Sequence, residues 1–239
     1  MNRTGWCWLL TVGLGLAAPV VASAAQVDVV LGPSLAGTVS RIDQVERRNE
    51  QEFREHRAYE GLDKRSERAV SADSVLSQVE WANEALIPDA GQYGLESLIR
   101  ALVTESLARA GMQSYDKTLR VTLNELGVTN HSVAPLRSAS NFATGRVEEI
   151  DPATGKSLRA VDVVSNLVVN STADRSYAGR DFAFDDTDPS RRVGPSVAYF
   201  VTSGLRQLFP DQTFPKVVTV LFGDRDPDDF PRPRLVRVR

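Results

Sequence analysis

The residues with the clearest potential for metal chemistry lie near the C-terminus, in the stretch GDRDPDDF that runs from Gly223 to Phe230. Its aspartates are Asp224, Asp226, Asp228 and Asp229. Their D-x-D-x-D spacing matches the first half of a calcium-binding loop, which then needs glycine at its sixth position and a bidentate glutamate at its twelfth. Here Asp229 occupies the sixth position and Leu235 the twelfth. The stretch also follows a strand-like segment, so we interpret it as a turn that binds no specific metal.

A second group of acidic residues lies in the stretch DFAFDDTDPSRR, just before a predicted helix. Its aspartates are Asp181, Asp185, Asp186 and Asp188. Asp188 precedes Pro189, which is a common way to start a turn, and Arg191 and Arg192 supply opposite charge nearby. We therefore predict a solvated loop, with a cation site as the alternative.

The chain contains two histidines, His56 in a highly charged segment and His131 in the loop after a predicted strand. A catalytic triad or a histidine zinc site usually needs histidine close to other ligands or catalytic groups. A site with a single histidine stays open, but we expect neither histidine to be catalytic.

Two further patterns resemble catalytic groups without fulfilling their requirements. Ser114 and Lys117 match the S-x-x-K motif of penicillin-recognising enzymes, but they follow a helix stop at Gly111 and no K-T-G motif accompanies them. Glu148 and Glu149 are adjacent in a predicted strand, where successive side chains point to opposite faces. The sequence therefore assigns no catalytic residue, cofactor-binding residue or metal ligand, and it predicts no cofactor.

The N-terminal residues 1–24 have the pattern of a secretory signal peptide. Arg3 is followed by the apolar run WCWLLTVGLGLAA and then by the small-residue segment PVVASAAQ. The expected cut falls after Ala24 or Ala25, which predicts a periplasmic or secreted protein. A membrane anchor is the alternative, but Pro19 and the cleavage pattern favour the signal peptide.

The composition narrows the class of protein. The only cysteine, Cys7, lies in the predicted signal, so the processed chain has no disulfide and no thiolate site. A secreted eukaryotic domain of this size usually carries disulfides, which favours an exported bacterial protein. The formal net charge of −3 gives no broad attraction to nucleic acid.

Residues 25–73 precede the predicted main domain. The stretch QVDVVLG predicts a strand, and GTVSRIDQV, residues 37–45, predicts a second one. Between residues 41 and 70 acidic and basic side chains alternate finely and large apolar ones are sparse, which predicts a charged linker or a solvated helix.

Residues 74–222 are predicted to form an α+β domain, followed by an Asp/Arg-rich tail over 223–239. The expected elements are helices at about 92–110 and 195–208 and strands at 119–128, 140–150, 156–169 and 216–222. Three consecutive strands indicate an antiparallel meander over about 119–169, with both amphipathic helices on one face of the sheet. Gly204 weakens the second helix, unless a strand packs closely against it.

A secretion signal, an early strand, an amphipathic helix, a long strand, the hairpin DPATGKSL and a closing helix occur in this order. This order resembles that of the small α+β auxiliary and assembly proteins of the Gram-negative outer membrane, many of which are lipoproteins. The resemblance covers residues 75–222 and concerns element order; the lipid-attachment cysteine of the lipoproteins is absent here.

The targeting signal, together with the lack of a catalytic set, leads to the functional hypothesis. We expect an exported, non-catalytic protein that binds or helps to assemble a cell-envelope component, with another envelope protein or an outer-membrane component as its partner. One alternative is a periplasmic hydrolase that uses Asp and Glu residues distant in sequence. Another is a structural subunit that adds a strand to the sheet of its partner.

Overall fold

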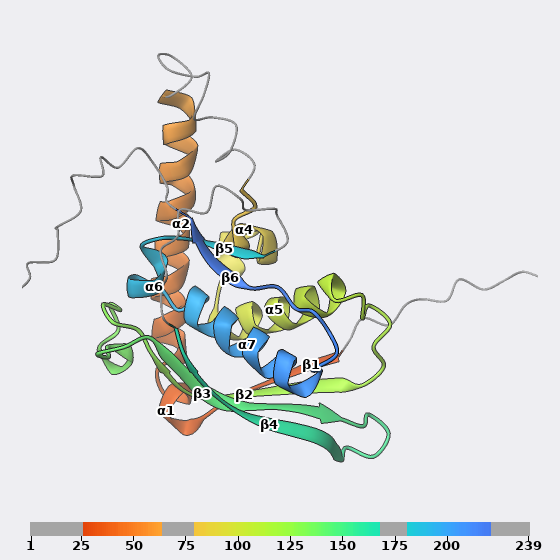
Figure 1. The fold of residues 1–239 in the computed structure, drawn as a ribbon. Coiled ribbons are helices and arrows are strands. Elements are labelled where there is room, and N and C mark those ends of the chain that lie inside the picture. The colour runs from red at the N-terminus through yellow and green to blue at the C-terminus, as the bar shows by residue number, and fades with distance from the viewer. Residues whose placement is uncertain (1–25, 64–78, 168–180, 221–239) are drawn as a thin grey trace, which may run out of the picture.

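A computed structural model describes residues 26–63, 79–167 and 181–220 of this chain (Figure 1). The strands are β1 Gln26–Leu31, β2 Thr118–Gly127, β3 Phe142–Ile150, β4 Ser157–Asn166, β5 Phe182–Asp185 and β6 Val217–Val220. The α-helices are α1 Pro33–Ala36, α2 Val39–Asp63, α4 Ala82–Leu86, α5 Leu95–Arg109, α6 Asp188–Arg191 and α7 Gly194–Leu208. Two short 3₁₀ turns are η1 Ala90–Gln92 and η2 Ala134–Leu136. None of the helices in these ranges is long and apolar enough to cross a membrane.

The four-stranded sheet has the order β1-β2-β3-β4. Strands β2, β3 and β4 pair antiparallel in sequence order, which confirms the predicted meander, and β1 joins the outer side of β2 in parallel. Helices α5 and α7 lie together on one face of this sheet (Figure 1). The α+β class and the placement of both amphipathic helices on one face are therefore confirmed.

The two faces of the sheet differ in polarity, because alternate residues of each strand point to opposite sides. The helix face carries buried apolar side chains, including Leu119, Val121 and Leu123 of β2. The other face carries a cross-strand row of ion pairs. Arg120 pairs with Asp28 at 2.7 Å and Arg146 pairs with Asp162 at 3.2 Å. A row of this kind suits a sheet with one face in water.

The helical layer supplies the other half of the core. Helix α5 buries Leu98, Ile99, Leu102, Val103 and Leu107, and α7 buries Val197, Phe200, Val201, Leu205 and Leu208. These positions recur at intervals of three and four residues, so each set forms one stripe along its helix. The stripes face the sheet and each other, which explains why both helices can be predicted from the sequence.

Gly204 marks the closest approach between α7 and the sheet. A methyl group added at this position would come within 2.5 Å of Cγ2 of Val147 and 3.2 Å of Cγ2 of Val163. Glycine is therefore needed at this position because two strands pack closely against the helix. This is the close strand packing that the sequence analysis named as the reason for a glycine within the helix.

Gly204→Ala should destabilise the protein by about 1–3 kcal/mol, because overpacking outweighs the better helix propensity of alanine. Chemical denaturation measures this difference. The matched control is Gln207→Ala, one turn further along α7 at an exposed position. An increase in the unfolding free energy of Gly204→Ala would show that helix and sheet have room to separate.

The region between residues 37 and 45 is helical, so the strand predicted there is wrong. It belongs to α2, which runs from Val39 to Asp63 and projects past the rest of the fold (Figure 1). Val39, Ile42 and Val45 recur every three residues, a spacing that suits a helix face better than an alternating strand. The alternative of a helix in the charged segment is confirmed for residues 41–63, although this helix is not solvated on all sides, because Glu46 and Glu50 are fully buried.

Strand β5 was missed by the sequence analysis, which assigned its residues to a solvated loop. All of its residues are buried, and it pairs in parallel with β6, the predicted last strand. The two strands lie on the opposite side of α5 and α7 from the four-stranded sheet (Figure 1). Helix α7 therefore packs against both sheets.

Candidate functional site

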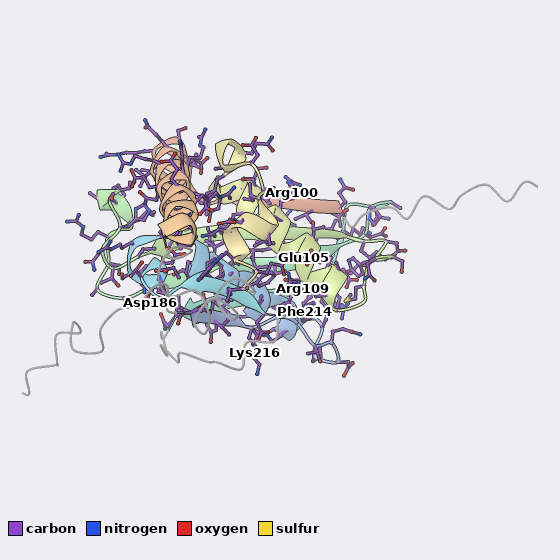
Figure 2. The ribbon with its side chains drawn as sticks, turned by 90° about the horizontal axis from the view of Figure 1, so that it is seen from above. Arg100, Glu105, Arg109, Asp186, Phe214 and Lys216 are labelled. Carbon is purple, nitrogen blue, oxygen red and sulfur yellow. The ribbon has the colours of Figure 1, made fainter. Side chains whose placement is uncertain are left out.

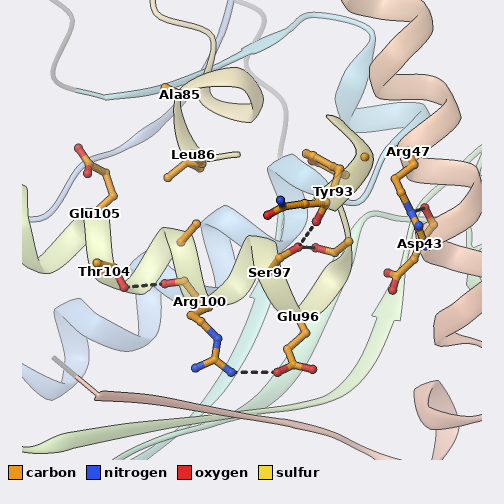
Figure 3. A pocket seen from close by; sticks show the side chains of 14 residues that line it. Asp43, Arg47, Ala85, Leu86, Tyr93, Glu96, Ser97, Arg100, Thr104 and Glu105 are labelled. Atoms are coloured by element: carbon orange, nitrogen blue, oxygen red, sulfur yellow. Dashed lines mark hydrogen bonds and ion pairs between the residues drawn. The ribbon is translucent and has the colours of Figure 1, made fainter. Parts of the chain in front are cut away.

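An open groove of about 670 Å³ runs between α2, α4, η1 and α5 (Figure 3). This volume lies within the range of small-ligand and peptide-segment sites, roughly 300–1,000 Å³. The apolar wall consists of Ala85 and Leu86 of α4 and Ala101 of α5. Arg47 and Glu105 lie at opposite ends of the groove (Figure 3). The groove therefore has one apolar wall and polar side chains along α5, with Arg47 beside Asp43 at one end and Glu105 at the other.

Asp43 joins the two helices that border one end of the groove. Its Oδ1 atom accepts a hydrogen bond from the backbone N–H of Leu95 at 2.8 Å. The N-cap residue of α5 is Gly94, which has no side chain of its own to accept this bond, so a carboxylate from α2 caps the helix instead. Burial raises the pKa of Asp43, while the bond from Leu95 and the charge of Arg47 act in the opposite direction.

The α5 side of the groove is held by further polar contacts. Arg100 donates a hydrogen bond to Glu96 at 2.9 Å and another to the backbone carbonyl of Val27 in β1. Ser97 lies within hydrogen-bonding distance of the carbonyl oxygens of Gln92 and Gly94 (Figure 3). The polar groups that line this side are therefore oriented before any ligand enters.

The charged ends of the groove are held in different ways. The Nε atom of Arg47 donates to the carbonyl of Asp43 at 3.2 Å, and the exposed side chain extends beside the groove (Figure 3). Glu105 forms an ion pair with Arg109 at 2.7 Å. Arg100, Glu105 and Arg109 follow one another along α5 (Figure 2).

Behind the groove lies a second feature, which we call the buried charge cluster. Its members are Glu46, Glu50, His131, Asp188 and Arg192. Tyr93 separates the cluster from the groove: it lines the groove, is itself buried, and donates its hydroxyl hydrogen bond to Oδ1 of Asn83 at 2.7 Å. The cluster is therefore closed to solvent.

Arg192 is the central cation of the buried charge cluster. Its guanidinium lies 2.6 Å from Oε2 of Glu50, 3.5 Å from Oε2 of Glu46 and 3.7 Å from Oδ1 of Asp188. Burial disfavours its charge, but the surrounding acidic groups outweigh this effect and raise its pKa. The guanidinium also lies over the Tyr93 ring, 5.4 Å from the centroid. One cation thus balances carboxylates from two separate helices.

His131 orients Glu46 within the cluster. Its Nδ1 atom accepts a hydrogen bond from the backbone N–H of Val133 at 3.0 Å. The proton of a neutral ring must then lie on Nε2, which donates to Oε1 of Glu46 at 2.9 Å. This histidine is buried and held by structural hydrogen bonds, whereas His56 lies in α2 with a side chain outside the described part of the structure.

Glu50 connects the cluster to the wall of the groove through Arg54. Arg54 donates from Nε to Oε1 of Glu50 at 2.8 Å, and its other nitrogens donate to the carbonyl oxygens of Ile87 and Pro88. Ile87 and Pro88 directly follow α4, which forms the apolar wall. The cluster and Arg54 together set the position of α2 relative to the groove.

The aspartates of DFAFDDTDPSRR do not form the solvated loop that we predicted. Asp185 and Asp188 are buried. Asp185 accepts hydrogen bonds from the backbone N–H and the hydroxyl of Thr187, while Asp188 faces Arg192 in the cluster. Within residues 26–63, 79–167 and 181–220, no group of three or more acidic or histidine side chains has the arrangement of a metal site.

The pH dependence of stability should report on Asp188. Burial raises its pKa to about 7, with Arg192 opposing the shift. The folded protein therefore binds a proton between about pH 4 and pH 7 that the unfolded chain releases, so stability should fall as the pH rises through this window. Asp188→Asn should remove this contribution, which amounts to at most about 4 kcal/mol.

The measurement is the unfolding free energy of wild type and variant between pH 4 and pH 8, with Asp116→Asn at an exposed position as the control. Parallel stability curves for wild type and Asp188→Asn would contradict the assignment of a protonated Asp188.

The remaining candidate residues lie apart from the groove. Lys117 pairs with Asp116 at 3.1 Å. Glu148 pairs with Arg146 on the solvent face of β3, whereas Glu149 is buried on the helix face, where it accepts a hydrogen bond from the Tyr115 hydroxyl. The two glutamates thus face opposite ways, as predicted. The stretch GDRDPDDF lies outside the described residues.

No protein-family model, curated protein or solved structure matches this chain. The groove and the buried charge cluster therefore carry the functional argument through their own geometry. Sequence reasoning missed both, although the i, i+4 spacing of Glu46 and Glu50 does place them on one face of a helix.

Proposed function

We propose that this protein is an exported, non-catalytic envelope protein that binds a cell-envelope component in the groove between α2 and α5. The observation that carries the proposal is the lining of the groove, in which an apolar wall of Ala85, Leu86 and Ala101 lies between Arg47 and Glu105 (Figure 3). An extended segment of another envelope protein, with an apolar centre and charged flanks, has the complementary chemistry.

The fixed orientation of the groove lining supports binding. Asp43 caps α5, and Arg100 is held by Glu96 and by the carbonyl of Val27. Groups that are already ordered lose little conformational entropy when a ligand arrives, so more of the contact energy contributes to affinity.

The carboxylates near the groove support binding over hydrolysis. A general acid needs a protonated carboxyl group that can reach the substrate. Glu96 and Glu105 instead form ion pairs with arginines, and Asp43 caps a helix. Glu46 and Glu50 are fully buried behind Tyr93. The carboxylates that line the groove are thus engaged in structural contacts, which favours binding over hydrolysis.

Site-directed photocrosslinking in the native host tests the proposed binding. A photoreactive residue in place of Ala101, inside the groove, should crosslink to a defined envelope component. The same residue in place of Lys156, at the exposed tip of the β3–β4 hairpin, should not. Arg47→Glu, which reverses the charge at one end, should weaken the Ala101 crosslink. Equal crosslinking from both positions, or no effect of Arg47→Glu, would contradict binding in the groove.

Export is a separate prediction. The mature protein should begin at Ala25 or Gln26 and should be recovered outside the cytoplasm. Intact-mass measurement of protein from the native host identifies the N-terminus, and fractionation identifies the compartment. A cytoplasmic product that retains Met1 would contradict this part of the proposal.

A further inference from the structure

Strand β4 is the last strand of the four-stranded sheet and pairs only with β3 in the described part of the chain. It is ten residues long and carries the two most exposed large apolar side chains among the described residues, Val164 at 75% and Leu158 at 49%. A long edge strand with exposed apolar side chains is a template for pairing with another strand.

The hydrogen bonds of β3 decide which groups of β4 point outward. The backbone N–H of Leu167 donates to the carbonyl of Asn141 at 2.9 Å. Bonded and non-bonded pairs alternate along an antiparallel ladder, so from Arg159 onward the odd-numbered residues of β4 bond to β3. The even-numbered residues Ala160, Asp162 and Val164 then direct their N–H and C=O groups to the open edge. Leu158 lies outside this regular part, because the register of β3 and β4 shifts between Glu149 and Ile150.

We propose that this edge binds the β4 strand of a second copy of the chain, antiparallel, with the two-fold axis at Val161. The outward N–H and C=O groups of the two strands can bond only when even-numbered residues lie opposite even-numbered residues. Paired residues lie at equal distances from the axis, so the axis must then pass through a residue and not between two residues. An axis at Val161 places Ala160 opposite the partner's Asp162 and brings the exposed Val164 to the end of the partner's strand that carries the exposed Leu158.

The neighbouring registers are less favourable. An axis at Asp162 would place the two Asp162 carboxylates opposite each other, and directly opposed like charges destabilise a pair of strands. An axis at Ala160 would place Asp162 opposite the end of the partner's β4 where the register shifts. An axis at Val161 avoids both arrangements.

The position of α7 fits the same arrangement. This helix packs over β3 and β4 (Figure 1). A two-fold axis beside β4 would therefore bring α7 and its symmetry mate to the same face of the combined sheet, next to each other across the axis. The second copy would thus extend the helical layer as well as the sheet.

Sedimentation equilibrium of the protein tests the proposal. The wild type should show a monomer–dimer equilibrium, and Val164→Lys should shift it to monomer. The matched control is Val30→Lys, because Val30 is 40% exposed on β1 at the other edge of the sheet. It should leave the dimer intact. A wild type that is monomeric at all concentrations, or a dimer that resists Val164→Lys, would overturn the proposal.

Disulfide crosslinking tests the register. In a Cys7→Ser background, Val161→Cys should form a covalent dimer on mild oxidation, because it faces its own copy across the axis with Cα atoms about 4.5 Å apart, within disulfide range. Val164→Cys would lie about 20 Å from its own copy in the partner, at 3.4 Å per residue, and should stay monomeric on a denaturing gel. Crosslinking of Val164→Cys to the same extent as Val161→Cys would contradict the register.

Discussion

Replacing Arg192 with methionine should lower the free energy of unfolding by about 3–5 kcal/mol, the usual cost of removing one partner from a buried ionic group. Methionine keeps much of the volume and removes the charge. Glu46, Glu50 and Asp188 would then face one another in the interior without the cation that they surround. Chemical denaturation at neutral pH measures the loss.

The control is Arg191→Met, because Arg191 is the adjacent residue and is exposed. It should change stability by about 0.5 kcal/mol or less, as surface substitutions usually do. Combining Arg192→Met with Glu46→Gln and Glu50→Gln should recover part of the stability, since this variant replaces two of the three carboxylates that would otherwise lose their cation. Equal losses for Arg191→Met and Arg192→Met would show that the cluster is not an interacting unit.

Leu102→Ala should cost about 2–5 kcal/mol, because it removes a large side chain from a well-packed core and leaves a cavity. Leu102 is fully buried at the centre of the α5 stripe, which faces the sheet and α7. Thermal or chemical denaturation of the variant measures the loss.

Thr104→Ala is the appropriate comparison, since Thr104 is exposed on the same helix and its hydroxyl bonds only to the carbonyl of Arg100, one turn earlier. Arg100 itself is a poorer control, because it bonds to β1 and to Glu96. Equal denaturation midpoints for Leu102→Ala and Thr104→Ala would mean that the buried face of α5 is assigned wrongly.

Leu102→Ala and Arg192→Met disturb the positions of two different helices. Leu102 holds α5 against the core, whereas Arg192 holds α2 through Glu46 and Glu50. The groove lies between α2 and α5, so its shape depends on both contacts. The crosslink from the photoreactive residue at position 101 can also be measured in Arg192→Met protein that remains folded. Its loss would show that the proposed binding depends on the buried charge cluster.

The sequence by itself determined the parts of this protein that depend on local patterns. The apolar stripes of α5 and α7 recur with the period of a helix, the meander strands alternate, and the turn between β3 and β4 carries its own signal in Asp151, Pro152 and Gly155. Each of these signals lies within about 20 residues of chain. The α+β class follows from their order.

The tertiary structure alone decided which charges are buried. Glu46 and Arg192 are far apart in the chain, and each belongs to a segment whose charge pattern is typical of a solvated surface. Their burial depends on a partner of opposite charge from another element, and no local pattern records such a partner. The groove between α2 and α5 arises in the same way, because its walls meet only after α2 has been fixed by contacts that span the chain.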